Sequence, residues 1–260
     1  MKIAVCVKSV PDTEAKISIL ADQLTFDHAG IKFITSPFDE YAIEAALQLK
    51  ERYGGEITAF SLGGEEVVEV LRNTLARGVD NGVHIKDPEF AGADPLTAAK
   101  ILAAAIDGGD FQLILCGQQG VGGDNSQVPA MLAELLDLPQ ATLVVALEIE
   151  ADKFKAHCEI EGAHQIVQGT LPAVISTGKG LNEPRYPSIK GVMAARRKEI
   201  VIKDAAALGL SGQLTASQRK VKLIALNAPP ARPSGKMIAG DPATQAHQLA
   251  RLLREEAKVL

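Results

Sequence analysis

The sequence predicts an α/β fold: a mostly parallel, doubly wound sheet with helices on both faces, a small antiparallel excursion and an extended C-terminal helical arm. The main observation is that short apolar segments alternate with helical segments up to about residue 136, which is the pattern of parallel sheets covered by helices. A second observation is the alternation of polar and apolar residues over 141–170, which indicates antiparallel strands. A third is a proline-rich stretch before a last amphipathic segment.

The first elements follow the order strand, helix, strand, helix. An apolar strand is expected at 2–7, then a loop with a small hairpin, and an extended piece at 31–34. Ser36 predicts the start of a helix as its N-cap residue, with Asp39 completing a capping box. Strands are then expected at 57–62, 82–86 and 111–116, with helices at 65–76 and 94–106.

Residues 110–136 form the segment around which the chain is organised. An apolar run at 111–116 predicts a buried strand, a helix follows from Val128, and Asp124-Asn125-Ser126 can cap that helix. Between them lie four glycines, Gly117, Gly120, Gly122 and Gly123. A glycine loop that leads into a helix can hold a phosphate, because free backbone N–H groups and the positive end of the helix dipole face the anion. The spacing matches neither common phosphate-loop motif, so a simple tight turn is the other interpretation.

The second half of the chain changes character. Antiparallel strands with a turn at Glu161-Gly162 are expected before an apolar strand returns to the core, and the chain becomes less globular from about Gly209. The segments are 141–150, 154–161 and 165–170 for the antiparallel strands, 171–177 for the returning strand, 178–199 for a polar loop with a short helix, and 199–202 for a last strand.

The end of the chain is predicted to be an arm. A linker is marked by Pro229, Pro230, Pro233 and the Ser234-Gly235 pair. Asp241 then caps an amphipathic helix, which needs a surface to cover on its own domain or on a partner. We therefore expect a nucleotide-binding α/β domain at 1–225 and a linker with a C-terminal arm at 226–260.

Composition narrows the function classes. The net charge of −5 argues against a general nucleic-acid binder, which needs a basic face. No apolar run approaches the roughly 20 residues of a membrane span, and no targeting peptide is recognised, so a bacterial-type cytoplasmic location is expected. Cys6, Cys116 and Cys158 are expected to be free thiols. No metal site is expected and no set of catalytic residues is recognised, which indicates a binding or carrier module.

Several segments carry family motifs. The most specific is Leu181-Asn182-Glu183-Pro184-Arg185-Tyr186, which follows Leu171-Pro172-Ala173-Val174. Further matches are Val5–Thr13, the helix start at Ser36–Leu47 and Glu159-Ile160-Glu161-Gly162. On these motifs the chain resembles the β (small) subunit of electron transfer flavoproteins, and the resemblance covers essentially the whole chain.

The resemblance implies a non-catalytic electron-carrier subunit. In this family the β subunit forms a heterodimer with a larger α subunit that carries the redox-active FAD, and the β subunit holds AMP with a structural role. Its C-terminal arm packs on the α subunit. Electrons pass from acyl-CoA or related flavoprotein dehydrogenases, as in fatty acid oxidation, through the FAD to a quinone oxidoreductase or another acceptor.

The resemblance also implies site residues. Phe38 is expected to reach toward the flavin of the α subunit. The loop that docks dehydrogenases is expected at 185–194 with Ile189 as its apolar anchor; the alternative is that Ile189 folds back onto its own domain. The docking residues are Arg185, Tyr186, Ile189 and Met193. The AMP-binding residues are Cys6, Ser36, Leu62, Gly117, Gln118, Gln119, Gly120, Val121, Gly122, Gly123, Asp124, Asn125, Ser126, Gln127 and Val128.

Departures from the family pattern leave alternatives open. Ser36 stands where the family usually has Asn. Gln127-Val128 is shared with a bifurcating branch, in which the β subunit holds a second FAD that accepts hydride from NADH, whereas Phe38 and Pro129 favour AMP. The alternative from another class is a regulatory module of the universal-stress type that binds AMP or ATP. Such a module would lack the 181–186 motif and the C-terminal arm.

Overall fold

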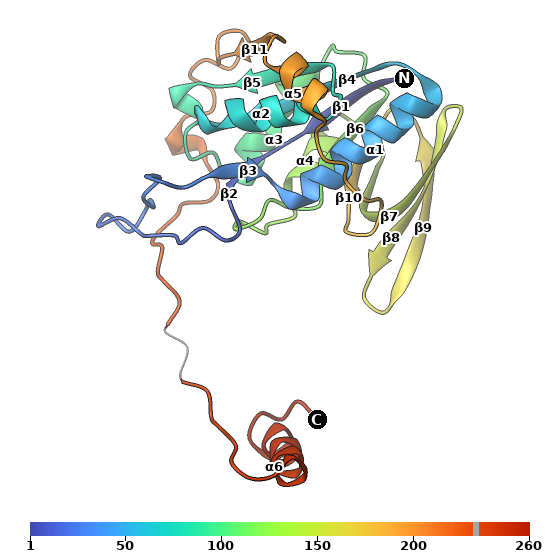
Figure 1. The fold of residues 1–260 in the computed structure, drawn as a ribbon. Coiled ribbons are helices and arrows are strands. Elements are labelled where there is room, and N and C mark those ends of the chain that lie inside the picture. Colours follow the sequence, from blue (N-terminus) through green and yellow to red (C-terminus); the bar gives the residue numbers. More distant parts are fainter. Residues whose placement is uncertain (231–233) are drawn as a thin grey trace.

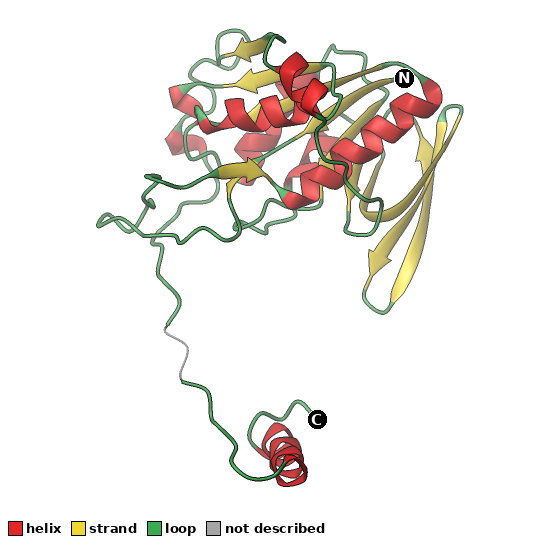
Figure 2. Cartoon of the chain, in the orientation of Figure 1, coloured by secondary structure: helices red, strands yellow, loops and turns green. Residues whose placement is uncertain are grey.

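The computed structural model describes residues 1–230 and 234–260, and it confirms the predicted α/β class. Figure 1 shows a central sheet flanked by helices, and Figure 2 shows strands and helices alternating through the body of the molecule. The strands are β1 (Lys2–Cys6), β2 (Ser9–Pro11), β3 (Phe33–Thr35), β4 (Glu56–Leu62), β5 (Asn81–Ile85), β6 (Leu113–Gly117), β7 (Gln140–Glu150), β8 (Lys153–Ile160), β9 (Ala163–Thr170), β10 (Ala173–Thr177) and β11 (Ile200–Lys203). The helices are α1 (Pro37–Tyr53), α2 (Glu66–Ala76), α3 (Pro95–Ile106), α4 (Val128–Leu135), α5 (Ile189–Ala195) and α6 (Pro242–Glu255), with short 3-10 turns at Pro88–Phe90 and Ala216–Gln218.

One sheet of nine strands runs through the molecule in the order β11-β5-β4-β1-β6-β10-β7-β8-β9. All neighbours from β11 to β7 pair in parallel, whereas β7, β8 and β9 pair antiparallel. The predicted antiparallel excursion is therefore confirmed as an extension of the main sheet, with its second turn at Glu161-Gly162 as expected. β2 and β3 form a separate antiparallel pair.

The core lies on both faces of the sheet, as a doubly wound fold requires. Side chains of β1 alternate between the faces: Ile3 and Val5 join the apolar cluster under α1 and α2, and Ala4 and Cys6 join the cluster under α3 and α4. Burial of a large apolar side chain stabilises a fold by about 1.5–3 kcal/mol. Because both clusters contain many such side chains, the helices on each face stabilise the sheet. The loops after β1, β4 and β6 consequently leave the same edge of a rigid sheet.

The start of α1 differs from the predicted capping box. Ser36 is the N-cap residue, but its side chain makes no capping bond, and its Oγ donates to the Gln119 carbonyl oxygen at 3.4 Å. Asp39 is buried and accepts hydrogen bonds from the backbone N–H groups of Lys8 (2.7 Å) and Gly117 (3.0 Å). The capping-box prediction was wrong because the ends of β1 and β6, which a local pattern cannot show, supply the donors for this carboxylate. Asp39 thus ties α1 to both strand ends.

Beyond Gly209, where the sequence predicts a less globular segment, most residues are exposed, but the chain keeps some contacts with the domain. Leu214 is buried. Asp94, at the start of α3, accepts hydrogen bonds from the N–H groups of Lys220 (2.6 Å) and Val221 (3.0 Å). The prediction is confirmed for most of the segment, and Asp94 and the apolar layer around α3 hold the part of it near Leu214 and Lys220.

The C-terminal arm lies apart from the sheet, at the end of an extended segment (Figure 1). Asp241 caps α6 as predicted, because it accepts hydrogen bonds from the N–H groups of Ala243 and Thr244, both at 3.0 Å. No α6 residue is buried. Pro233, which the sequence assigns to the linker, lies outside the described residues. Among the helices of the described ranges, none has the length and apolar character needed to cross a membrane.

Candidate functional site

A cavity opens at the carboxyl edge of β1, β4 and β6, where their loops meet. Its volume is about 860 Å³, which is in the range of ligand pockets. Ligands of open parallel sheets bind at this edge. Most of the predicted nucleotide-binding residues line it: Cys6, Leu62, Gly117, Gln118, Gln119, Gly120, Gly123, Asp124, Asn125, Ser126, Gln127 and Val128.

Four predicted cofactor-site residues lie outside this lining, namely Ser36, Phe38, Val121 and Gly122. Ser36 is fully buried behind the lining, against Gln119. Phe38 is half-buried in the first turn of α1, and its carbonyl oxygen accepts a hydrogen bond from Thr177 Oγ1 (3.2 Å). Because a Cβ at position 117 would come within 2.7 Å of the Phe38 carbonyl carbon, only Gly117 lets the helix approach the end of β6 this closely.

The loop between Gly123 and α4 holds free backbone donors. Within the described ranges, no hydrogen-bond acceptor is found for the N–H groups of Asn125, Ser126 and Gln127. Asp124 (φ 46°) and Ser126 (φ 51°) adopt left-handed backbone conformations, which are uncommon for residues with a side chain and cluster at functional sites. Successive N–H groups ahead of a helix N-terminus form a binding place for an anion. The loop therefore suits a phosphate group.

The side chains of this loop do not cap α4, contrary to the prediction. The N-cap residue is Gln127, and its side chain makes no capping bond. Ser126 Oγ donates to Gln119 Oε1 (2.8 Å), and Asp124 Oδ1 accepts from Gln119 Nε2 (2.9 Å). The prediction was wrong because the Gln119 side chain competes for both groups. These bonds hold the loop in shape and leave its backbone donors free.

Lys8 is a lining residue that the sequence prediction missed. Its side chain crosses Gly120, because a Cβ on that glycine would come within 2.5 Å of Lys8 Cδ and 2.9 Å of Lys8 Nζ. A lysine two residues after a strand has no local signature of a binding residue. The available signal is topological, because the loops that follow neighbouring parallel strands lie at the same edge of the sheet.

Ionisable groups lie at the floor of the cavity. Cys6 and Cys116 are register partners on β1 and β6, and both are buried free thiols. The hydrogen bond with Cys6, together with burial, raises the pKa of the Cys116 thiol. Burial raises the pKa of Asp39 to about 7, against the opposing effect of its two backbone hydrogen bonds. In the described part of the chain, no three or more His, Cys, Asp or Glu side chains are grouped to hold a metal ion.

The raised pKa of Asp39 predicts pH-dependent stability. Between about pH 4 and pH 7 the folded protein keeps a proton on Asp39 that the unfolded chain releases, so this residue's contribution to the free energy of unfolding falls as pH rises through that window. Asp39→Asn removes the titration but also loses one of the two acceptors for backbone N–H groups, so only the change with pH in its stability relative to the wild type is diagnostic. From urea denaturation we expect the variant to gain about 2–3 kcal/mol relative to the wild type between about pH 5 and pH 8. A difference that does not change with pH would contradict this expectation.

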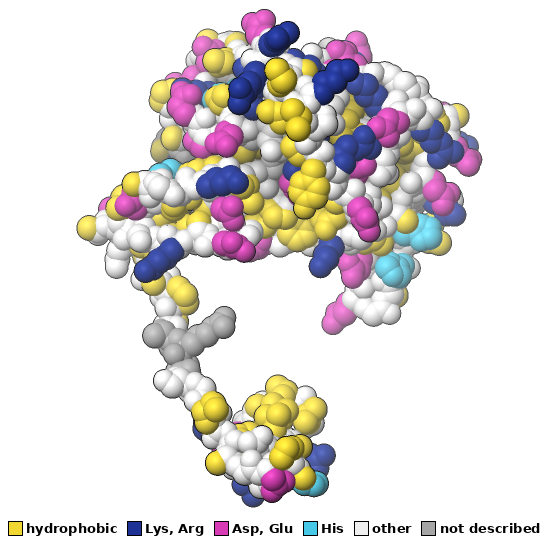
Figure 3. All heavy atoms as spheres, viewed as in Figure 1, with side chains coloured by type: hydrophobic (Ala, Val, Ile, Leu, Met, Phe, Trp, Pro, Cys, Tyr) yellow, Lys and Arg dark blue, Asp and Glu magenta, His cyan; other side chains and the backbone are white. Residues whose placement is uncertain are grey.

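The predicted docking residues lie on or near α5, and one side of this helix packs against the domain. Ala195, at the end of α5, is buried, and its carbonyl oxygen accepts a hydrogen bond from Arg72 of α2. Ile189 and Met193 lie one turn apart on the same helix face, with 84% and 59% of their surface exposed, and Tyr186 is 91% exposed. Figure 3 shows hydrophobic side chains at the surface near α5, next to basic ones. Ile189 therefore does not fold back onto its own domain.

Arg185 differs from the other predicted docking residues, because its guanidinium group is turned toward its own domain. Its Nε and Nη2 atoms donate to Glu44 of α1 at 2.8 and 2.9 Å. The same guanidinium group forms an ion pair with Glu51, two turns further along α1. Burial alone would raise the pKa of Glu44, but the hydrogen bonds from Arg185 and Gln48 outweigh it and lower the pKa. Arg185 thus anchors the loop that precedes α5.

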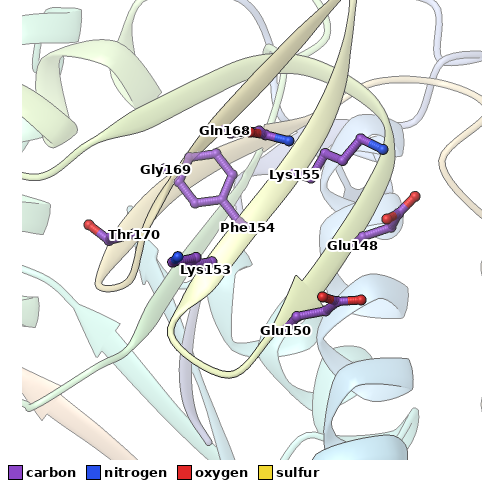
Figure 4. Close-up of a pocket in the computed structure, with 8 residues that line it drawn as sticks. All are labelled: Glu148, Glu150, Lys153, Phe154, Lys155, Gln168, Gly169 and Thr170. Carbon is purple, nitrogen blue, oxygen red and sulfur yellow. The ribbon is translucent and has the colours of Figure 1, made fainter.

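A second hollow, of about 530 Å³, lies on the β7–β8–β9 extension, and Figure 4 shows the residues that line it. Glu148 and Glu150 of β7 stand opposite Lys155 and Lys153 of β8, so the charges on this face compensate one another across the strands. None of the predicted site residues lines it. The cavity at the carboxyl edge therefore remains the candidate nucleotide site.

Comparison with known proteins finds relatives over nearly the whole chain. The family model described as "Electron transfer flavoprotein domain" matches residues 23–208. A Bacillus subtilis (strain 168) protein named "Electron transfer flavoprotein subunit beta" is 40% identical over 261 residues, which cover 100% of both chains. Proteins of the same name are 37% identical in Syntrophomonas wolfei (100% of this chain, 98% of the relative) and 34% identical in Dictyostelium discoideum (92% and 93%). On these matches, the chain belongs to the electron transfer flavoprotein beta-subunit family.

Proposed function

We propose that this chain is the β subunit of a heterodimeric electron transfer flavoprotein, in which it holds AMP as a structural nucleotide and supports the α subunit that bears the FAD. Family membership supports the electron-carrier role. The observation that carries the nucleotide assignment is the loop before α4, because its residues Asn125, Ser126 and Gln127 line the cavity and their N–H groups have no acceptor among the described residues. The N–H groups of Asn125, Ser126 and Gln127 bind the phosphate, and the apolar part of the cavity around Leu62 and Phe90 receives the adenine.

The FAD, which supplies the redox chemistry, is held mainly by the α subunit. This chain contributes Phe38 toward the flavin and has a positioning role rather than a catalytic one. Two side chains support that role: Thr177 Oγ1 donates to the Phe38 carbonyl oxygen, and the neighbouring Asp39 accepts hydrogen bonds from the ends of β1 and β6. Phe38 is therefore mounted on a helix end that the sheet fixes.

Dehydrogenases of the acyl-CoA or a related flavoprotein class dock on α5, and the reduced complex passes its electrons to a quinone oxidoreductase or another acceptor. The exposure of Ile189, Tyr186 and Met193 supports this surface, because a few apolar and aromatic anchors dominate the binding energy of most interfaces. The C-terminal arm packs on the α subunit. There the α subunit covers the apolar side chains of α6 that are exposed in the single chain.

A second candidate function is that of a bifurcating subunit, in which a second FAD replaces AMP and accepts hydride from NADH. The size of the cavity favours it: the lining continues past the phosphate loop to Lys86, Phe90 and Leu102. FAD contains AMP as one of its halves, so the same loop would hold a phosphate in both cases. Bound nucleotide analysis separates the two.

Arg185→Gln is expected to loosen the docking loop. The variant leaves the Glu44 carboxylate, which is 5% exposed, without its cation. We expect this to cost about 1–2 kcal/mol of stability. The cost is not larger because Arg185 is 36% exposed, so solvent weakens the ion pair. We expect the KM for the dehydrogenase to rise roughly fivefold, with the nucleotide content unchanged. Glu51→Gln is the matched control, since the Glu51 side chain is 60% exposed. Equal effects of the two variants would contradict the anchoring role of Arg185 on Glu44.

The function is tested by producing the chain together with the α subunit from the same organism. We expect a 1:1 complex by light scattering, whose flavin an acyl-CoA or related dehydrogenase reduces. A chain that stays a monomer, binds ATP tightly and shows no affinity for the α subunit would instead support the regulatory module of the universal-stress type.

A further inference from the structure

Lys8 places a positive charge over the glycine loop. Its backbone N–H is fixed by the buried Asp39 carboxylate (2.7 Å), so the start of the side chain is held at the end of β1. The stem then runs across Gly120, as the distances of 2.5 Å to Cδ and 2.9 Å to Nζ from the missing Cβ position show. A Cβ on Gly123 would lie 3.6 Å from the same Nζ atom. The ammonium group therefore lies beside Gly120 and Gly123 of the loop.

This positive charge has no negative partner in the described part of the chain. Lys8 Nζ forms no ion pair there, whereas Lys86, the other lysine that lines the cavity, pairs with Glu65. The lining carboxylates already have donors. Asp39 accepts from two backbone N–H groups, Asp124 from Gln119, Glu66 from the N–H of Gly64, and Asp87 from the N–H groups of Glu89 and Ala205. Lys8 and the loop residues Asn125, Ser126 and Gln127, whose N–H groups have no acceptor among the described residues, thus line the same cavity.

We infer that Lys8 is the cation that binds the phosphate of the adenine nucleotide, and that Gly120 is glycine to let the Lys8 side chain reach it. This inference rests on the proposed function, which assigns a nucleotide to the cavity. Neutral N–H groups alone do not balance the charge of a phosphate. A charge-assisted hydrogen bond from an ammonium group is roughly twice as strong as a neutral one. Lys8 therefore discriminates in favour of a phosphate-bearing ligand.

The test compares ligands with and without the phosphate. The complex with the α subunit is stripped of its nucleotide under mild denaturation, refolded, and titrated calorimetrically with AMP and with adenosine. For Lys8→Met we expect an affinity for AMP that is about tenfold weaker and an unchanged affinity for adenosine. Lys8→Arg keeps the charge and is expected to retain most of the AMP affinity. Lys86→Met is the matched control, because it removes a lysine of the same cavity that already has a partner.

The outcomes separate the inference from the proposed function. A wild-type complex that binds no adenine nucleotide would overturn the proposed function. A wild-type complex that binds AMP, with Lys8→Met binding it equally well, would overturn only the role of Lys8. Equal weakening of AMP and adenosine would also overturn that role, because it would show general damage to the cavity. If the wild type takes up FAD rather than AMP, FAD replaces AMP in the comparison, and the same loss is expected.

Discussion

Gly123→Glu is expected to remove most of the bound nucleotide from the complex, whereas Gly123→Ala is expected to keep it. A Cβ at this position meets nothing closer than Lys8 Nζ at 3.6 Å, which is ordinary contact, so alanine fits. Glutamate brings a negative charge next to the phosphate loop and offers Lys8 a competing partner. Loss of the charged contact and the added repulsion together cost about 3 kcal/mol, which is roughly a hundredfold in affinity.

The measurement is the adenine nucleotide retained per purified complex, with the thermal unfolding of both variants as the control for the fold. Gly123→Ala tests whether the position tolerates a side chain, so the difference between the variants isolates charge and bulk beside the phosphate. Full nucleotide occupancy in Gly123→Glu would show that the glycine loop is only a tight turn between β6 and α4.

Ile189→Ala is expected to weaken reduction of the flavin by the dehydrogenase without affecting nucleotide or FAD content. The side chain is 84% exposed on a helix held by Arg72, so truncation removes contacts with a partner and leaves the domain intact. A central apolar anchor contributes about 2 kcal/mol or more to an interface, which corresponds to a rise in KM of roughly thirtyfold. Steady-state kinetics with the dehydrogenase as the varied substrate measures it.

Ile202→Ala is the matched control for this prediction. Ile202 is also an isoleucine, is 66% exposed, and lies on the edge strand β11 rather than on α5. We expect its KM to stay within about twofold of the wild type, as for exposed residues outside an interface. An unchanged rate in Ile189→Ala, or the same change in both variants, would contradict the anchor assignment.

Features that depend on neighbouring residues could be predicted from the sequence. The alternation of apolar segments predicts the parallel sheet and both helix layers. Asp241 was correctly expected to cap α6, because it accepts a hydrogen bond from the N–H group of Thr244, three residues later, at 3.0 Å. The glycine loop was correctly expected between an apolar strand and a helix, which are β6 and α4.

Features that depend on distant residues could not be predicted in this way. Asp39 has the spacing of a capping residue, but its partners are strand ends that only the folded sheet brings together. Arg185 stands in a docking motif, yet Glu44, which holds it, is 141 residues away. Lys8 reaches the glycine loop from another strand. In each case the neighbours of the side chain are distant in the sequence, so a local pattern cannot show them.

The central claim is that this chain binds an adenine nucleotide at the edge of its sheet within the complex with the α subunit. The most direct test is to release the nucleotides of the purified complex by heat and to quantify them by HPLC. We expect one FAD and one AMP per heterodimer. Two FAD and no AMP would make the loop a flavin site and NADH-driven bifurcation the mechanism. One FAD with no further adenine nucleotide would contradict the claim.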